Sequence, residues 1–136
     1  MIVYPAYIYM GSAGGPANPV IFQQNEINYT YSGTNFTVTT NGYIELQSNS
    51  ELVFSGLDLS NFEKLSVQVH NGSKTVTLTI NFIDNSGNTS ANITWRVDGD
   101  TLTSRVFTIP TEYRKPKTKI KFSSNRKITL YYAKLS

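Results

Sequence analysis

The sequence predicts an all-β protein, built as an antiparallel two-sheet β-sandwich with a short N-terminal arm. The clearest pattern runs from Leu65 to Val97, where apolar and polar residues alternate in three successive runs. A period of two places one set of side chains on a buried face and the other set in water. Charged residues reach only 15%, and nine tyrosines suit a pleated, half-buried surface. A sheet with one apolar face requires a second sheet against it.

Two parts are expected along the chain of 136 residues. Residues 1–19 form an apolar, tyrosine-containing arm followed by a hinge rich in glycine and proline, a composition that cannot hold a helix or a central strand. Residues 20–136 form the sandwich domain. The arm has few local partners, so we expect it to pack either on its own sandwich or on a neighbouring subunit.

Strands are expected wherever an alternating or apolar run is bounded by turn residues. The expected strands cover residues 20–23, 27–31, 36–40, 43–46, 52–54, 65–70, 76–82, 93–97, 101–110, 118–122 and 127–135. Gly33 and the Ser48–Ser50 segment are expected to interrupt strands, and Asn41-Gly42 indicates a hairpin. The three runs from Leu65 to Val97 are expected to be neighbouring antiparallel strands, joined through Asn71-Gly72-Ser73 and residues 84–88. Strands that recur about every 8–12 residues are typical of a sandwich.

Five segments between Leu52 and the C-terminus carry a resemblance to a known family. They are LDLSNFEKLSVQVHN, VTLTINFIDNSGN, ITWRV, RVFTIP and KITLYYAKL. Their order resembles a jelly-roll carbohydrate-binding module, the galactose-binding-like β-sandwich. The N-terminal GSAGGPANPVI is similar to segments that precede a strand in β-sandwich modules of phage tail and baseplate proteins. These resemblances imply a jelly roll, a glycan ligand and a place in a virion.

The sequence contains no grouping of residues that indicates catalysis or a resident metal. There is no cysteine, and the single histidine, His70, cannot form a histidine-based metal site alone. Asp84 to Asn88 place oxygen ligands around a tight turn, but a single carboxylate favours a hairpin turn over a calcium site. We therefore expect a protein that is not an enzyme and needs no cofactor or metal.

No segment of the sequence predicts targeting to or through a membrane. No apolar run approaches membrane-spanning length, and the residues after Met1 lack the pattern of a signal peptide. We therefore expect no membrane partner, and a location in a virion or otherwise in the cytoplasm.

Charge is distributed unevenly along the chain. Residues 1–63 contain five acidic residues and no Lys or Arg. The eight basic residues after Tyr113 are Arg114, Lys115, Lys117, Lys119, Lys121, Arg126, Lys127 and Lys134. Such a segment can bind nucleic acid or another polyanion. Lys119 and Lys121 alternate with Ile120 and Phe122, however, which favours the ordinary solvent face of a strand, so nucleic acid is not an expected partner.

A set of polar residues is expected to face outward from the sandwich. These candidate ligand-binding residues are Gln68, His70, Asn81, Arg96, Arg105 and Tyr131. Amides, a guanidinium and a phenol can offer paired hydrogen bonds and a flat ring to a sugar. The alternatives are a solvated sheet face or a subunit interface. Trp95 is in phase with Ile93 and Val97, so it is expected in the core and not on a sugar-stacking platform.

These patterns favour a phage-type virion accessory or structural protein that forms homo-oligomers or binds virion partner proteins through its arm, and that can also bind cell-surface carbohydrate. Two alternatives remain open at this stage. One is a free carbohydrate-binding module without a structural role, and the other is a polyanion binder that uses the basic C-terminal segment.

Overall fold

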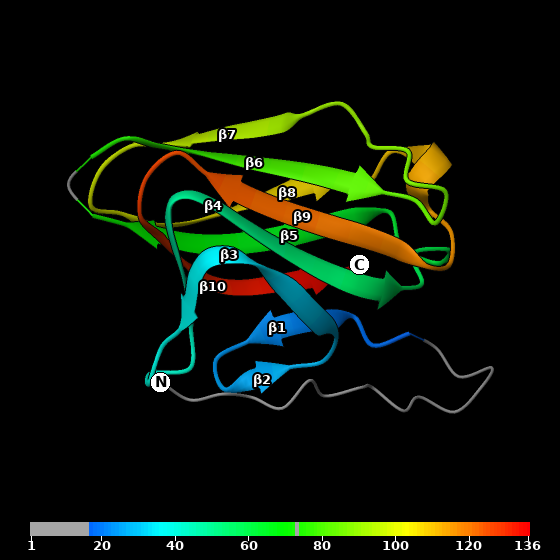
Figure 1. Ribbon diagram of the computed structural model, residues 1–136, viewed down its shortest axis with the longest axis horizontal. Helices are drawn as coiled ribbons and strands as arrows, with labels where there is room; N and C mark the ends of the chain where they lie inside the picture. The colour runs from blue at the N-terminus through cyan, green and yellow to red at the C-terminus, as the bar shows by residue number, and fades with distance from the viewer. Residues whose placement is uncertain (1–16, 73) are drawn as a thin grey trace.

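The structure is a computed structural model that describes residues 17–72 and 74–136, which form ten strands and one short 3-10 helix. The strands form two layers (Figure 1). The front sheet has the order β3 (Thr30–Val38), β4 (Ile44–Leu57), β9 (Thr118–Ser124), β6 (Val76–Ile83) and β7 (Ile93–Val97). The rear sheet has the order β2 (Glu26–Ile27), β1 (Val20–Gln23), β10 (Ile128–Leu135), β5 (Lys64–Asn71) and β8 (Leu102–Thr108). The helix, η1, covers Thr111–Tyr113.

All of the strand pairings among the described residues are antiparallel, and the predicted β-sandwich is confirmed. The predicted arm, residues 1–19, lies almost entirely outside the described residues, which begin at residue 17. The strands of the sandwich begin at Val20 and end at Leu135. Among the described residues, no helix is long and apolar enough to cross a membrane.

The long strand β4 belongs to both sheets and joins them at one corner. Its first residues, Ile44–Leu46, pair with β10 of the rear sheet, and its second half pairs with β9 of the front sheet. The register between β3 and β4 shifts between Thr34 and Phe36, where Asn35 has φ 58°. Irregularities of this kind let a strand bend and change sheets.

Two interruptions that the sequence predicted in this region are wrong. The Ser48–Ser50 segment lies within β4, and Asn49, with φ 57°, contributes to the bend instead of ending the strand. Gly33 lies inside β3 at φ 142°, and a Cβ there would sit 1.8 Å from the carbonyl oxygen of Glu51. Glycine is thus required by the close approach of two paired strands, and that requirement looks the same as a turn signal in the sequence.

The predicted pairing of the first two runs from Leu65 to Val97 is also wrong. β5 pairs with β10 and β8 in the rear sheet, whereas β6 pairs with β9 and β7 in the front sheet. The connection that follows Asn71, the last residue of β5, therefore crosses from one sheet to the other. The buried Asn71 side chain stabilises the crossing, because its Nδ2 donates to the carbonyl oxygens of Lys74 (2.8 Å) and Val97 (3.0 Å). The β6–β7 hairpin is confirmed.

The core lies between the two sheets and contains aromatic contacts that cross it. Phe22 of the rear sheet stacks on Phe54 of the front sheet, with ring centroids 5.7 Å apart. Trp95 is 6% exposed and meets Phe107 of the rear sheet edge to face at 5.7 Å. The prediction that Trp95 belongs to the core is therefore confirmed.

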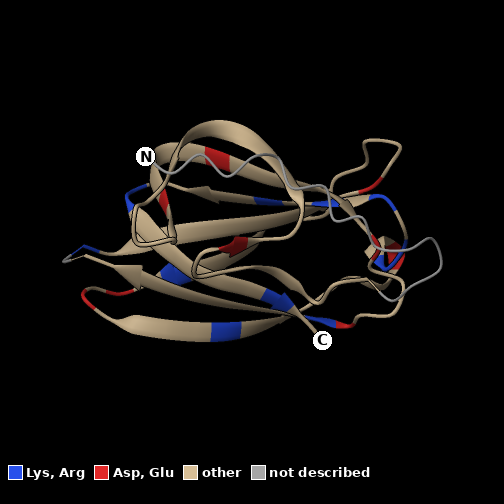
Figure 2. Ribbon diagram, turned by 90° about the horizontal axis from the view of Figure 1, so that it is seen from below, with Lys and Arg blue, Asp and Glu red and all other residues tan. Residues whose placement is uncertain are grey.

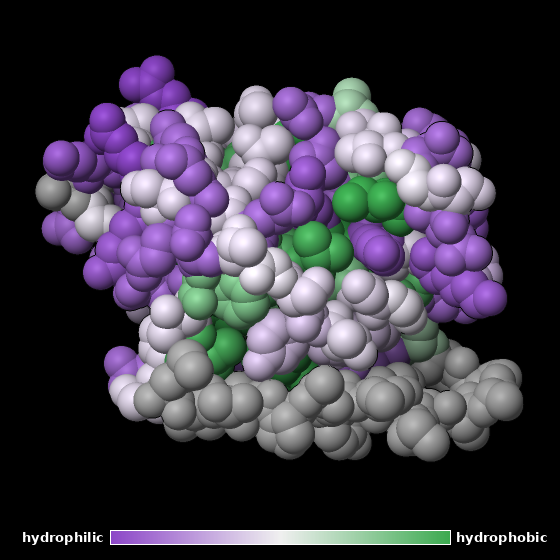
Figure 3. Space-filling model, viewed as in Figure 1, coloured by the Kyte–Doolittle hydropathy of each residue, from purple (hydrophilic) through white to green (hydrophobic). Residues whose placement is uncertain are grey.

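The outer face of the front sheet carries alternating threonines of β6, such as Thr77 and Thr79, which are half-buried. Figure 3 looks onto this face and shows hydrophilic and hydrophobic side chains interspersed. No broad aromatic surface is formed by the described residues of this face.

Candidate functional site

Three of the six candidate residues lie close together on the outer face of the rear sheet. Gln68 and His70 alternate with the buried Val67 and Val69 on β5, so they point away from the core. On the neighbouring β10, the ring of Tyr131 lies 6.4 Å from the ring of His70. This part of the candidate set forms one continuous surface.

The other three residues are not brought to this surface. Asn81 and Arg96 belong to the front sheet. Asn81 is buried, and its Nδ2 donates to Ser90 O (3.2 Å) and Asn92 Oδ1 (2.8 Å), so it holds the β6–β7 connection. Arg96 is exposed, with its Nε 3.4 Å from Asp98 Oδ1.

The predicted phase of Arg105 is wrong. Arg105 pairs in register with the buried Val67 and lies two residues before the buried Phe107, so it belongs to the inward face of the edge strand β8. Its guanidinium carbon lies 5.6 Å from the centre of the Phe107 ring. Arg105 remains exposed because β8 is at the edge of the rear sheet. It covers the end of the core and takes no part in the surface around Tyr131.

An irregularity in β10 brings two tyrosines to the same face. Leu130 pairs with Val69 and Tyr132 pairs with Gln68, so Tyr131 is an extra residue in this strand. A bulge re-aims side chains in this way. Tyr131 and Tyr132 are both half-buried, while Leu130 and Ala133 on either side are buried.

The tyrosines line a shallow groove of about 210 Å³ on the outer face of the rear sheet. We call this groove the tyrosine shelf, and it is lined by Gln23, Gln24, Tyr43, Gln68, Tyr131, Tyr132 and Lys134. Enclosed small-molecule pockets measure about 300–1,000 Å³. The tyrosine shelf would therefore cover only part of a ligand and leave the rest in solvent.

Contacts between side chains make the tyrosine shelf rigid. The rings of Tyr43 and Tyr131 stack with centroids 4.0 Å apart and an angle of 14°. Lys134 Nζ lies 4.6 Å from the centre of the Tyr132 ring, a cation–π contact. Two of the three rings thus support each other, and the ammonium group of Lys134 lies over the third.

Hydrogen bonds within and between loops position Tyr43 and Gln24. Tyr43 follows the predicted Asn41-Gly42 hairpin, which is closed by bonds from Thr39 N to Tyr43 O (2.8 Å) and from Gly42 N to Thr39 O (2.9 Å). Gln24 Nε2 donates to Asn41 O at 3.0 Å and so links the β1–β2 turn to this hairpin. Together with Gln68 of β5 and the residues of β10, four separate segments of the chain therefore meet at the tyrosine shelf.

The groups at the tyrosine shelf suit a ligand with both apolar and hydroxyl surfaces. Phenol rings offer flat apolar faces, and phenol hydroxyls and glutamine amides can both donate and accept hydrogen bonds. The lining residues include no carboxylate. This combination fits a sugar ring, which presents C–H groups on its faces and hydroxyls at its rim.

The turn from Asp84 to Asn88 is held by its own hydrogen bonds. Asp84 Oδ1 accepts from the backbone N–H groups of Ser86 and Asn88, both at 2.9 Å, and Oδ2 accepts from the Asn88 side chain at 3.0 Å. Lys115 Nζ lies 3.3 Å from Oδ2. The Asn88 side-chain bond, together with the other three bonds and against the effect of burial, lowers the pKa of Asp84 to about 2. Among the described residues, no three His, Cys, Asp or Glu side chains form a cluster that could hold a metal ion.

Solved structures that share this fold include carbohydrate-binding modules. No protein-family model matches the chain, and no curated protein matches it. A family 6 carbohydrate-binding module from Clostridium cellulolyticum, solved in complex with xylose, superposes with a TM-score of 0.57 at 13% identity, covering 79% of this chain and 97% of the module. The protein therefore has the β-sandwich fold of carbohydrate-binding modules, as the resemblance implied.

Two further matches are to parts of larger chains. The structure of PfGH50B superposes with a TM-score of 0.68 at 14% identity, and the match covers 88% of this chain but 23% of that chain. The enzymatically active domain of tailspike protein 4 from bacteriophage CBA120 superposes with a TM-score of 0.52 at 15% identity, covering 79% of this chain and 18% of that chain. At these identities the likeness extends to the fold alone.

Proposed function

We propose that this protein is a carbohydrate-binding module that holds a glycan on the tyrosine shelf. The observation that carries the proposal is the gathering of Tyr43, Tyr131 and Tyr132 with Gln68 at one groove on this fold. Several carbohydrate-binding modules share the fold, including one solved with cellobiose and one solved with xylose. The shallow groove suits an accessible polysaccharide, because only part of the chain needs to contact the protein.

We infer a binding role without catalysis at this groove. Glycoside hydrolysis generally uses a pair of carboxylates on either side of the scissile bond. The lining residues of the tyrosine shelf supply amides, phenols and an ammonium group instead.

A glycan array followed by calorimetric titration with the best neutral and the best acidic oligosaccharide tests the proposal. Tyr131→Ala is expected to weaken binding roughly tenfold or more, because a buried aromatic contact at an interface is typically worth over 1 kcal/mol. Tyr131→Phe is expected to keep most of the affinity, since it keeps the ring.

The matched control is Thr79→Ala on the outer face of the front sheet, which is expected to leave affinity unchanged. Melting temperatures of all three variants show whether each has folded. Unchanged affinity of a folded Tyr131→Ala variant would rule out the tyrosine shelf as the binding site.

We propose a role in a phage-type virion as the second candidate function. The supporting observation is the match to part of a bacteriophage tailspike protein. In this role the module would reside in the virion, and its apolar N-terminal arm would bind a second copy or another virion protein; otherwise the protein would stay in the cytoplasm. Light scattering with size exclusion tests it: an oligomer that is lost on deleting residues 1–19 supports this role, and a monomer unaffected by the deletion contradicts it.

A further inference from the structure

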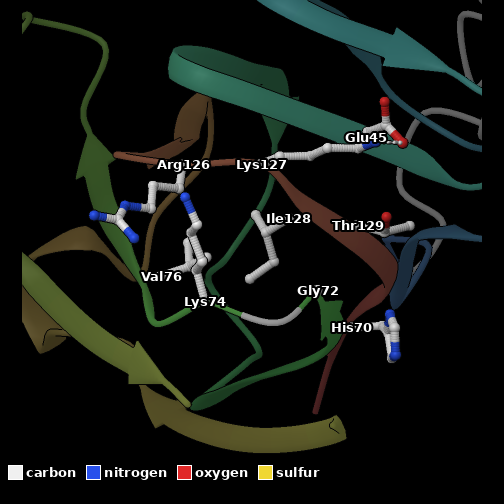
Figure 4. Close-up of a pocket in the computed structure, with 9 residues that line it drawn as sticks. All are labelled: Glu45, His70, Gly72, Lys74, Val76, Arg126, Lys127, Ile128 and Thr129. Carbon is white, nitrogen blue, oxygen red and sulfur yellow. Dashed lines mark ion pairs between the residues drawn. The ribbon is translucent and has the colours of Figure 1, made fainter. Parts of the chain in front are cut away.

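A second and larger cavity, of about 400 Å³, opens beside the tyrosine shelf at one end of the sandwich. We call it the basic pocket, because three cationic side chains, Lys74, Arg126 and Lys127, line it together with a single carboxylate, Glu45. Arg126 and Lys74 lie together on one side, Ile128 lies in the middle, and Glu45 and His70 lie on the opposite side (Figure 4).

Two of the three cations have no acidic partner within the part of the chain that the structure describes. Lys127 Nζ lies 3.5 Å from Glu45 Oε2, so that pair is internally neutralised. The four ion pairs among the described residues involve neither Lys74 nor Arg126. The basic pocket therefore carries a net positive charge that is available to an anionic ligand.

The floor of the basic pocket strengthens this attraction. Val76 and Ile128 line it, and each is only 1% exposed. An anion seated over this apolar floor would exchange part of its water for charged donors, which interact more strongly where water is partly excluded. The planar guanidinium of Arg126 can donate two parallel hydrogen bonds to a carboxylate or a sulfate.

The basic pocket and the tyrosine shelf are adjacent on the same strands. His70 lines the pocket, and its ring lies 6.4 Å from the ring of Tyr131 on the shelf. Thr129 also lines the pocket, pairs directly with His70, and precedes Tyr131 by two residues on β10. Two residues of a strand span about 7 Å, so the edge of the basic pocket at Thr129 lies close to Tyr131. An oligosaccharide of several units can extend from the tyrosine shelf across the pocket to Lys74 and Arg126 on its opposite side.

We propose that the basic pocket binds the anionic group of an acidic glycan, a carboxylate or a sulfate, while another sugar unit of the same glycan lies on the tyrosine shelf. This inference rests on the proposed function and specifies its ligand class. The tyrosine shelf supplies the contacts to the sugar, and Lys74 and Arg126 select for negative charge.

Matched pairs of polysaccharides test the charge preference of the full chain. Polygalacturonate, glucuronoxylan and alginate are compared with their carboxyl-reduced forms, and carrageenan and chondroitin sulfate are compared with their desulfated forms, all at about 0.15 M salt. The first set isolates the carboxylate, and the second set isolates the sulfate. We expect at least one acidic polysaccharide to bind about tenfold more tightly than its neutralised form, as one charge-assisted hydrogen bond would give.

Charge-removing variants assign that preference to the basic pocket. In Lys74→Gln/Arg126→Gln the tenfold margin, by which the acidic polysaccharide binds more tightly than its neutralised form, is expected to disappear. Binding of the neutralised polysaccharide is expected to be retained. The control, Lys119→Gln/Lys121→Gln, removes the same charge from β9 of the front sheet and is expected to keep the margin. Tyr131→Ala is expected to weaken both members of a pair.

The outcomes separate this inference from the proposed function. Equal binding of each acidic polysaccharide and its neutralised form, or a margin that survives Lys74→Gln/Arg126→Gln, overturns the charge preference and leaves the tyrosine shelf as a glycan site. Binding of inorganic polyphosphate as tightly as the best acidic polysaccharide also overturns it, because the sugar would then contribute nothing. Failure to bind any polysaccharide overturns both.

Discussion

The single tryptophan contributes to stability by bridging the two sheets. Trp95 of β7 packs edge to face against Phe107 of β8, and both side chains are 6% exposed. Emptying a large aromatic site in a core leaves a cavity that neighbouring side chains fill only partly. The Trp95 side chain therefore contributes to the packing of the two sheets against each other at this end of the sandwich.

We expect Trp95→Ala to lower the free energy of unfolding by about 3–5 kcal/mol, the usual range for this substitution in a core. Urea denaturation measures the change. In the wild type, tryptophan emission should be blue-shifted and move to the red on unfolding. The exposed neighbour Thr94 gives the control Thr94→Ala, expected to change stability by less than about 0.5 kcal/mol. A native emission maximum at the wavelength of the unfolded protein would contradict burial of Trp95.

Acid should weaken the turn that Asp84 holds. The folded pKa of Asp84, about 2, lies below its ordinary value of 3.8. A carboxyl whose pKa is lowered by folding stabilises the protein above the ordinary value, and this contribution is lost as the pH falls through the folded value. We expect the stabilisation from Asp84 to be complete at pH 7 and to disappear between about pH 4 and pH 2.

Thermal unfolding of Asp84→Asn across this range measures the effect. The melting temperature of the variant should lie below that of the wild type at neutral pH, and the difference should shrink towards pH 2. Glu112→Gln, at an exposed position of η1, serves as the control. Its difference in melting temperature from the wild type should not shrink towards pH 2 in this way. A difference that is constant with pH would show that the Asp84 charge does not hold the turn.

Among the structural elements, the connection from β5 to β6 depends on one buried amide. Asn71 Nδ2 donates to Lys74 O and Val97 O, while its own Oδ1 is buried and accepts no hydrogen bond from the described residues. Asn71→Ala would leave two carbonyl groups without their donor, which typically costs about 1–3 kcal/mol. Because the unbonded Oδ1 is removed as well, we expect a loss in the lower half of that range.

Urea denaturation of Asn71→Ala beside Asn85→Ala checks this expectation. Asn85 is exposed in the β6–β7 turn, so its substitution should change stability by less than about 0.5 kcal/mol. Equal stability of the two variants would show that the sheet crossing does not depend on Asn71. Both variants keep the tyrosine shelf intact and should bind glycans alike.

Alternation in the sequence identifies strands but does not identify their partners. It places Gln68 and His70 correctly on the outer face of β5, because each strand of a sandwich has one face buried and one face exposed to solvent. It cannot show that β5 and β6 lie in different sheets, because hairpin turns and sheet crossings use the same Asn-Gly signals. The switch from buried Ile128 and Leu130 to buried Ala133 and Leu135 does signal the bulge, since a regular strand cannot change phase.

The tyrosine shelf as a whole could not be predicted, because its residues come from segments that are distant in the sequence. Tyr43 follows a hairpin, Gln23 and Gln24 lie at the β1–β2 turn, and the other residues belong to β5 and β10. Only their packing brings them together. Arg105, by contrast, could have been placed from its spacing of two residues before Phe107.

At the scale of the whole molecule, the basic C-terminal segment does not form a continuous track. Figure 2 shows basic positions spread over several strands and loops. Lys115 pairs with Asp84, Lys127 pairs with Glu45, and Lys134 lies over the Tyr132 ring. A local concentration of basic side chains remains only at the basic pocket, where a ligand can neutralise one or two charges.

This distribution predicts no measurable binding of nucleic acid at about 0.15 M salt. A nucleic-acid binder neutralises several phosphates at once, so that the logarithm of its affinity falls by several units for each tenfold rise in salt, whereas one pocket supports a slope of only one or two. Among the described residues that line the basic pocket, His70 is the single aromatic side chain, so the pocket offers no row of rings on which successive bases could stack. Fluorescence anisotropy with single- and double-stranded DNA and RNA, at about 0.05 and 0.15 M salt, measures the affinity and its dependence on salt. A micromolar, salt-sensitive complex that is lost in Lys119→Glu/Lys121→Glu would contradict the prediction, because those lysines lie on the front sheet, away from both proposed glycan contacts.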